Sequence, residues 1–178
     1  MKAKFIKSTM LLVLAIYLMG ISACGSGSGS TSYFKTVTVT PVGTVASTTS
    51  TVLPSGNTSD AAVTVTLQST AYSNVTKPSP VTVVSSTIRY YKTGNSPSYA
   101  PATLPDQPGP AGQIPAGGSL AFSFDTASGI FKNNLVANSG FVSGQPWQYK
   151  VMYYFNLVED YTNTAITSIV DGGTITFQ

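Results

Sequence analysis

Alternation of apolar and polar residues is the feature that most restricts what this chain can fold into. It is strongest over residues 147–159, where Trp147, Tyr149, Val151, Tyr153, Phe155 and Leu157 occupy every second position. A period of two places these side chains on one face of a β-strand. Met152, Tyr154 and Val158 give the opposite face apolar character as well, so we expect this strand to lie in the middle of a sheet.

Shorter segments with the same period predict further strands at residues 33–41, 50–53, 62–70, 81–92, 119–125, 164–170 and 174–178. Within residues 81–92 the apolar phase changes from Val81 and Val83 to Val84, Ile88 and Tyr90, which predicts a bulge near Val83. The Asp-Gly-Gly sequence at residues 171–173 predicts a turn. Residues 126–144 fit either one helical turn or an irregular strand.

Seven or so short strands without a long helical pattern predict an all-β fold, a single antiparallel β-sandwich, with a closed barrel as the main alternative. Residues 149–156, followed by a turn and a last strand, resemble the penultimate strand of a fibronectin type III or related immunoglobulin-like domain. Residues 114–119 are similar to the entry into a mid-domain strand of such sandwiches. The resemblance covers about residues 31–178 and implies the fold alone. The chain departs from antibody-type domains because it lacks their cysteine pair and carries its only tryptophan on a late strand.

The N-terminal residues have the order basic, apolar, small. Lys2, Lys4 and Lys7 precede an apolar run at residues 10–19, and small residues follow before Cys24. This order is typical of an export signal. The apolar run is much shorter than the roughly 20 residues that a membrane-spanning helix needs, so cleavage is the expected outcome.

Ile21, Ser22, Ala23 and Cys24 resemble the lipobox of a bacterial lipoprotein signal. The resemblance implies a mature chain that begins at Cys24 and is held in the membrane of the cell envelope by acyl chains such as palmitate. Gly25 is not the aspartate that retains such lipoproteins at the inner membrane, so the outer membrane is expected if the cell has two. The alternative is an ordinary signal peptide with Cys24 as an incidental thiol.

These signals divide the chain into three parts: a signal peptide at residues 1–23, a lipidated cysteine with a flexible Gly/Ser tether at residues 24–32, and a β-sandwich domain at residues 33–178. The tether has no large apolar side chain to bury and therefore no reason to fold.

The charge of the chain argues against nucleic acid as a partner. The sequence has nine Lys and Arg and six Asp and Glu, but three of the basic residues belong to the signal. The remaining six basic residues are balanced by the six acidic ones. Binding to phosphates requires a clustered excess of cations, which this composition does not provide.

Side chains for catalysis are also few. The chain has no histidine, and its only cysteine is assigned to the anchor, which removes the usual nucleophile–base pairs and most zinc or copper ligand sets. We therefore expect no enzyme, cofactor or metal site. A hydrolytic carboxylate pair and a calcium site at residues 159, 160 and 171 remain as alternatives, although aspartates beside glycine or at strand ends more often serve turns. The carboxylates in question are Asp106, Asp125, Glu159, Asp160 and Asp171.

A non-enzymatic binding or structural module that docks an envelope or cell-surface protein is the expected function. Residues 93–118 carry six of the eleven prolines and are long for a connection, so they form a candidate binding loop with Tyr99, Leu104 and Asp106. The competing interpretation is that this segment only crosses between sheets and covers an edge.

The alternative function is capture of a glycan or another small ligand at the membrane. The candidate residues for stacking a sugar ring are Tyr90, Tyr91, Tyr99, Tyr153 and Tyr154. Of these, Tyr90 and Tyr153 have the phase of buried positions and are expected in the core, which leaves the others as candidates for an exposed platform.

Overall fold

The computed structural model describes residues 35–178. The predicted signal peptide, the lipobox, Cys24 and the tether lie outside the described residues. The described chain consists of two β-sheets and one short helix, which confirms the all-β expectation. Within this part, no helix is long and apolar enough to cross a membrane.

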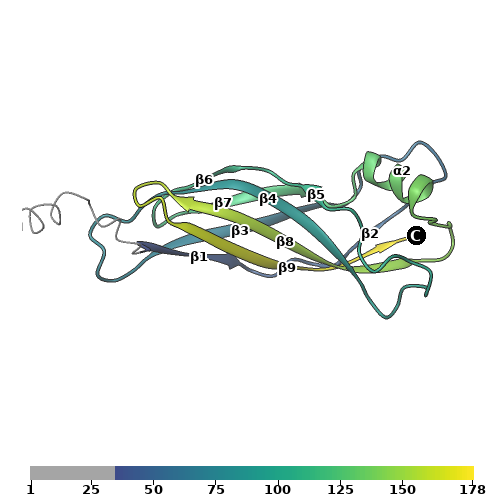
Figure 1. Cartoon of the computed structure of the whole chain (residues 1–178), viewed down its shortest axis with the longest axis horizontal. Coiled ribbons are helices and arrows are strands. Elements are labelled where there is room, and N and C mark those ends of the chain that lie inside the picture. The colour runs from purple at the N-terminus through teal and green to yellow at the C-terminus, as the bar shows by residue number, and fades with distance from the viewer. Residues whose placement is uncertain (1–34) are drawn as a thin grey trace, which may run out of the picture. The chain divides into compact units, whose positions relative to one another are not determined.

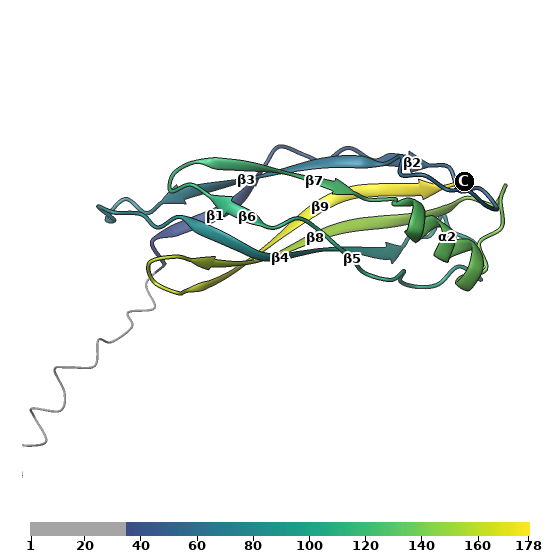
Figure 2. The same ribbon diagram turned by 90° about the horizontal axis from the view of Figure 1, so that it is seen from above.

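The two sheets contain three and six strands, and their arrangement can be followed in Figures 1 and 2. The first sheet has the order β1 (Val37–Val42), β3 (Ala62–Ala71), β7 (Ser119–Asp125). The second has the order β2 (Thr48–Ser50), β9 (Ala165–Phe177), β8 (Trp147–Glu159), β4 (Val81–Lys92), β5 (Gln107–Pro108), and β6 (Gly112–Ile114) also pairs with β4. The helix α2 (Gly129–Asn138) lies at the end of the sheets that is opposite the β8–β9 turn (Figure 1).

The strand β8 has the predicted bounds and lies between β9 and β4, as its two apolar faces indicated. Its inward side chains pack on the first sheet: the rings of Phe124 and Tyr153 are 4.6 Å apart between centroids, and those of Phe122 and Phe155 are 5.4 Å apart. Tyr90 and Tyr153 are buried, as predicted. Aromatic residues from both sheets therefore form the centre of the core.

The predicted bulge in β4 is confirmed between Val83 and Ser85, but its consequence for Val84 was predicted wrongly. Val84 is 60% exposed, and the buried positions continue at Ser86, Ile88 and Tyr90. The bulge inserts one residue, so the side chain of Val84 turns outward. The alternation of buried and exposed residues resumes at Ser86, two residues after Val84.

The predicted turn at residues 171–173 is wrong, because β9 continues through these residues as one strand. A second bulge lies here, where the pairing with β8 shifts between Lys150 and Met152. Gly173 has a φ of 68°, and its amide donates to Asp171 Oδ1 at 2.9 Å. The Asp-Gly-Gly sequence thus does not reverse the chain. Its glycine supplies the positive φ that the bulge requires.

The expectation of purely antiparallel pairing is wrong at β2, which pairs with β9 in parallel. After β1 the chain crosses to the other sheet without reversing its direction, so it runs alongside the last strand in the same sense (Figure 1). The first strand was predicted to end at Pro41, and β1 continues past this proline to Val42. Because β1 is an edge strand, a missing amide donor is tolerated there.

The ambiguous segment at residues 126–144 contains the helix α2. Its N-cap is Ser128, whose Oγ accepts a hydrogen bond from the amide of Phe131 at 3.2 Å. Phe131 and Leu135 are buried four residues apart on one side of the helix, and Ile130 is 79% exposed. The helix therefore covers one end of the core and leaves an apolar side chain facing solvent.

Candidate functional site

The proline-rich segment at residues 93–118 covers the outer edge of β4. Its short strands β5 and β6 pair with β4, and a single bridge joins Thr103 to Tyr91. Lys92 Nζ donates to the carbonyl oxygens of Ser98 and Ala100, both at 2.9 Å. The segment leads from the second sheet to the first and protects an edge on the way, as the competing interpretation of this loop stated.

The three predicted loop residues have different surroundings. Leu104 is buried in the core. Tyr99 is half exposed, with its hydroxyl donating to Gln145 and its ring edge-on to Trp147 at 6.0 Å. Asp106 is exposed and accepts a hydrogen bond from Arg89 Nε at 3.1 Å. Of the three, Asp106 lines a groove that the sequence did not predict.

This groove has a volume of about 570 Å³, within the range of known ligand pockets, and we refer to it as the α2 groove. Its lining comes from three places in the chain: the proline-rich segment at residues 105–110, the end of β7 at residues 123–125, and the first turns of α2 with Ser128, Ile130, Phe131 and Asn134. Phe124 and Phe131 give it an apolar floor, and Asp106 and Asp125 are its charged groups.

One wall of the α2 groove is fixed by the buried side chain of Gln107. Its amide nitrogen donates to the Tyr90 hydroxyl and to the carbonyl of Thr126, the latter at 3.3 Å. Its amide oxygen accepts from Ser128 Oγ at 3.1 Å. Burial raises the pKa of Tyr90 well above its usual value, so this hydroxyl stays protonated and donates to the Thr126 carbonyl at 2.7 Å. The network joins the proline-rich segment to β4 and to the start of α2.

Gly109 allows the same wall to lie against the core. A Cβ atom at this position would lie 2.2 Å from Phe124 Cε1 and 2.5 Å from Ser86 Oγ. Only glycine permits this close approach. Such a contact between segments distant in sequence leaves no pattern that a single sequence reveals.

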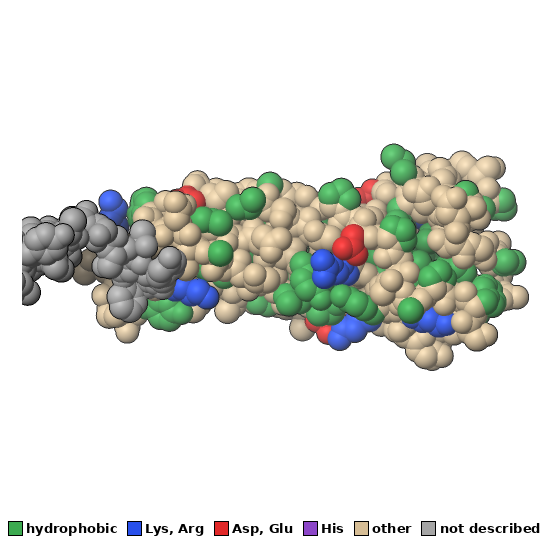
Figure 3. Space-filling model, in the orientation of Figure 1, with side chains coloured by type: hydrophobic (Ala, Val, Ile, Leu, Met, Phe, Trp, Pro, Cys, Tyr) green, Lys and Arg blue, Asp and Glu red, His purple; other side chains and the backbone are tan. Residues whose placement is uncertain are grey.

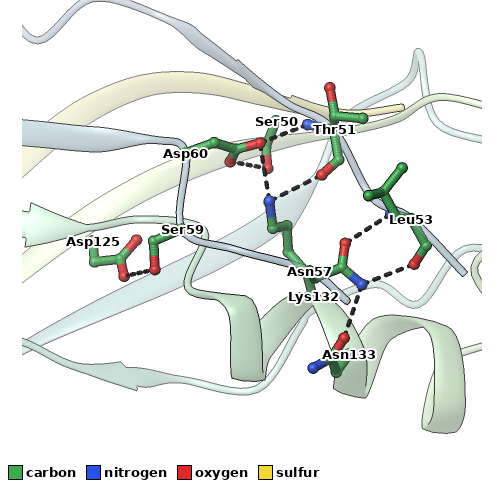
Figure 4. Close-up of polar contacts among 9 residues, drawn as sticks. All are labelled: Ser50, Thr51, Leu53, Asn57, Ser59, Asp60, Asp125, Lys132 and Asn133. Atoms are coloured by element: carbon green, nitrogen blue, oxygen red, sulfur yellow. Dashed lines mark hydrogen bonds and ion pairs between the residues drawn. The ribbon is translucent and has the colours of Figure 1, made fainter. Parts of the chain in front are cut away.

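The position of α2 is fixed from its other side by Lys132, which is only 2% exposed (Figure 4). Its ammonium lies 2.9 Å from Asp60 Oδ2 and donates to the carbonyl of Thr51, also at 2.9 Å. Burial raises the pKa of Asp60, but hydrogen bonds from Ser50, Lys132 and Thr51 outweigh this and hold it below its usual value. Sequence reasoning missed this pair, although a lysine among the apolar residues of 130–136 was a signal.

Three of the five candidate carboxylates have structural roles. Glu159 is buried and accepts hydrogen bonds at the start of β1, Asp160 accepts from Thr82 Oγ1 at 2.6 Å, and Asp171 pairs with Lys150 at 2.8 Å. Over residues 35–178, no group of three or more acidic, histidine or cysteine side chains could hold a metal ion. Asp106 and Asp125 are the two that the structure brings to one site.

A second surface lies on the outer face of the six-stranded sheet. The hydroxyls of Tyr91 and Tyr154 are 3.1 Å apart, and the guanidinium of Arg89 lies over the Tyr154 ring at 4.5 Å from its centroid. Figure 3 shows hydrophobic side chains gathered beside basic and acidic ones over β4 and β8. The predicted tyrosine platform is thus partly covered by Arg89.

No protein-family model matches this chain, and neither a curated protein nor a solved structure matches it.

Proposed function

We propose that this chain is an exported lipoprotein, anchored in the cell envelope through Cys24, that acts as a non-enzymatic binding module with the α2 groove as its binding site. The observation that carries the proposal is the groove itself. It is concave, has an apolar floor and two carboxylates, and has the strongly exposed Ile130 in its lining. Pockets with mainly apolar linings and a few polar groups are typical of binding sites.

The domain is proposed to be an immunoglobulin-like or fibronectin III-like sandwich. In that fold, strands A, B and E belong to one sheet and strands C, F and G to the other. The six longest strands follow the same division: β1, β3 and β7 form one sheet, and β4, β8 and β9 belong to the other. The proline-rich segment then replaces the strand that the seven-stranded form places between C and E.

The anchor is tested by replacing Cys24 with serine. We expect this variant to lose lipid labelling completely and to accumulate as unprocessed or soluble protein, because serine offers no thiol for acylation. Metabolic labelling with a radioactive fatty acid measures the result. Labelling that persists in Cys24→Ser would contradict the lipoprotein assignment.

The binding site is tested by replacing Ile130 with asparagine in the cells that make the protein. After chemical crosslinking, we expect the captured amount of one envelope protein to fall about tenfold, the change that loss of about 1.4 kcal/mol of apolar contact produces. Tyr161→Asn is the matched control, since Tyr161 is 59% exposed in the β8–β9 turn, far from α2. Equal capture by wild type and Ile130→Asn would reject the α2 groove.

Glycan capture remains a second candidate, favoured by the exposed Tyr91 and the half-buried Tyr154 beside it. Flat aromatic faces stack on sugar rings, but Arg89 occupies one ring here. This candidate therefore places the ligand on Tyr91. If the protein captures a glycan, capture should depend on Tyr91 and not on Ile130, which distinguishes this candidate from binding in the α2 groove.

A further inference from the structure

The strand β7 is the least protected edge in the described part of the two sheets. It has seven residues without proline, lysine or arginine, and it pairs only with β3. The other edges have protective features: β1 contains Pro41, β2 is only three residues long, and β4 is covered by β5 and β6. Long edges without such features are the places where a further strand can add.

The end of this edge borders the α2 groove. Residues 123–125 of β7 line the groove and no residue of β3 does, so the groove lies on the side of β7 that faces away from its partner. Among residues 35–178, no backbone hydrogen bond joins β7 to the proline-rich segment opposite. In an antiparallel strand, successive residues direct their backbone amide and carbonyl groups alternately to one side of the strand and to the other. Backbone donors and acceptors at residues 123–125 are thus available on the groove side.

The opposite wall does not compete for these groups. Pro105, Pro108 and Pro110 have no amide hydrogen, and Gly109 donates its own amide to the Ser86 carbonyl at 2.9 Å. This wall offers an apolar and stiff surface. A segment lying between the two walls would form its backbone hydrogen bonds with β7 and pack its side chains on Phe124 and Phe131.

The charge of the groove indicates what such a segment carries. Its lining includes two carboxylates and no lysine or arginine. Asp106 is paired with Arg89, but Asp125 has no cation within ion-pair distance in the described chain and accepts only from Ser59 Oγ. A cationic side chain of the ligand would neutralise this site. A second copy of β7 would not, because that strand has no basic residue.

We infer that the occupant of the α2 groove is an extended segment of a partner protein, with a lysine or arginine between apolar residues, which adds as a short strand to residues 123–125 of β7. This inference rests on the proposed function, since it names the ligand class of the same groove. Strand addition supplies affinity through the backbone, and the carboxylates select for positive charge.

A synthetic peptide of alternating valine and threonine with a central lysine provides the test, using the isotopically labelled full chain and amide NMR. We expect shifts at residues 123–125 and Asn134. The same peptide with glutamate in place of lysine should bind about tenfold more weakly, equivalent to about 1.4 kcal/mol. A peptide with N-methylated backbone amides should lose most of its binding. Asp125→Asn should weaken binding of the lysine peptide about threefold, whereas Asp171→Asn, which removes a carboxylate outside the groove, should not.

Equal binding of the lysine and glutamate peptides, unchanged binding after N-methylation, or no binding at millimolar concentration would each overturn the inference. The peptide experiments and the test of the proposed function can fail independently of each other. If Ile130→Asn still lowers capture in cells about tenfold while the peptides show no preference, the groove binds a partner of another kind. If Ile130→Asn has no effect on capture, the proposed function itself is wrong.

Discussion

Replacing Glu159 with alanine is expected to lower the free energy of unfolding by about 3 kcal/mol. Its side chain is 0% exposed, and the carboxylate accepts hydrogen bonds from the amides of Thr36 at 2.8 Å and Val37 at 3.1 Å. Thr162 Oγ1 donates to it as well, at 2.7 Å. Alanine leaves these donors without a partner, and each unsatisfied buried group costs about 1–3 kcal/mol. The first strand would lose its attachment to the end of β8.

Glu159→Gln is the matched variant, because glutamine keeps the size of the side chain and one acceptor oxygen. We expect it to lose about half as much stability as alanine. Urea unfolding of the purified full chain, followed by circular dichroism, measures both. If Glu159→Ala unfolds within 1 kcal/mol of wild type, a scale set by the energy of one ordinary hydrogen bond, the carboxylate does not hold β1 in place.

Replacing Asp60 with alanine is expected to have the second large effect on the free energy of unfolding. Asp60→Ala leaves the ammonium of Lys132 buried without a counter-charge, and breaking a buried pair from one side costs about 3–5 kcal/mol. We expect a value near 3, because Asp60 itself is about one-third exposed and water can partly replace it. Hydrogen exchange should show lost protection in α2, since Lys132 holds the helix against residues 50–60.

Lys132→Met provides the control. It removes the buried charge and keeps most of the apolar length, so its cost should be about 1 kcal/mol. In the double variant Asp60→Ala/Lys132→Met, most of the loss caused by Asp60→Ala should be recovered, and a thermodynamic cycle of the four proteins measures the coupling. A double variant that is no more stable than Asp60→Ala would show that the charge on Lys132 is not the cause.

The same pair predicts a dependence on pH. The pKa of Asp60 is lowered in the folded chain, so its contribution to stability is fully present above the unfolded-state pKa of about 3.9. It is lost as the pH falls through the folded-state pKa. The difference in stability between wild type and Asp60→Ala should therefore be constant near neutral pH and shrink in acid.

The parts of the fold that the sequence predicts well are those where one strand has a strong period of its own. β8 has the expected bounds because its large apolar residues are in phase over a dozen positions. β4 also has them, because its apolar alternation resumes after the bulge between Val83 and Ser85. The local sequence of Asp171, Gly172 and Gly173 is the same as that of a common turn. These residues form a bulge only because they pair with the strand β8. The short apolar run around Phe131 likewise does not distinguish helix from strand.

The α2 groove could not be predicted in this way, because its three segments lie within residues 105–134 but are brought together as walls only by the folded sheets and α2. Asp106 was identified as a candidate from the proline-rich loop, whereas Ile130 was not. Gly109 and Gln107 hold the groove wall through contacts with Phe124 and Tyr90, and such contacts have no signature in a single sequence. The proline-rich segment thus indicated one wall of the groove, but it gave no indication of the walls formed by β7 and α2.

Site-specific photo-crosslinking in living cells tests the location of the binding site most directly. A photoreactive phenylalanine analogue is placed at Ile130 in the α2 groove, at Tyr91 on the outer face, or at Tyr161 in the distant β8–β9 turn, all of them exposed positions. We predict that irradiation links one envelope protein to the chain from Ile130 and from neither of the other two. A partner linked from Tyr91 or Tyr161 but not from Ile130 would contradict the assignment of the groove as the binding site.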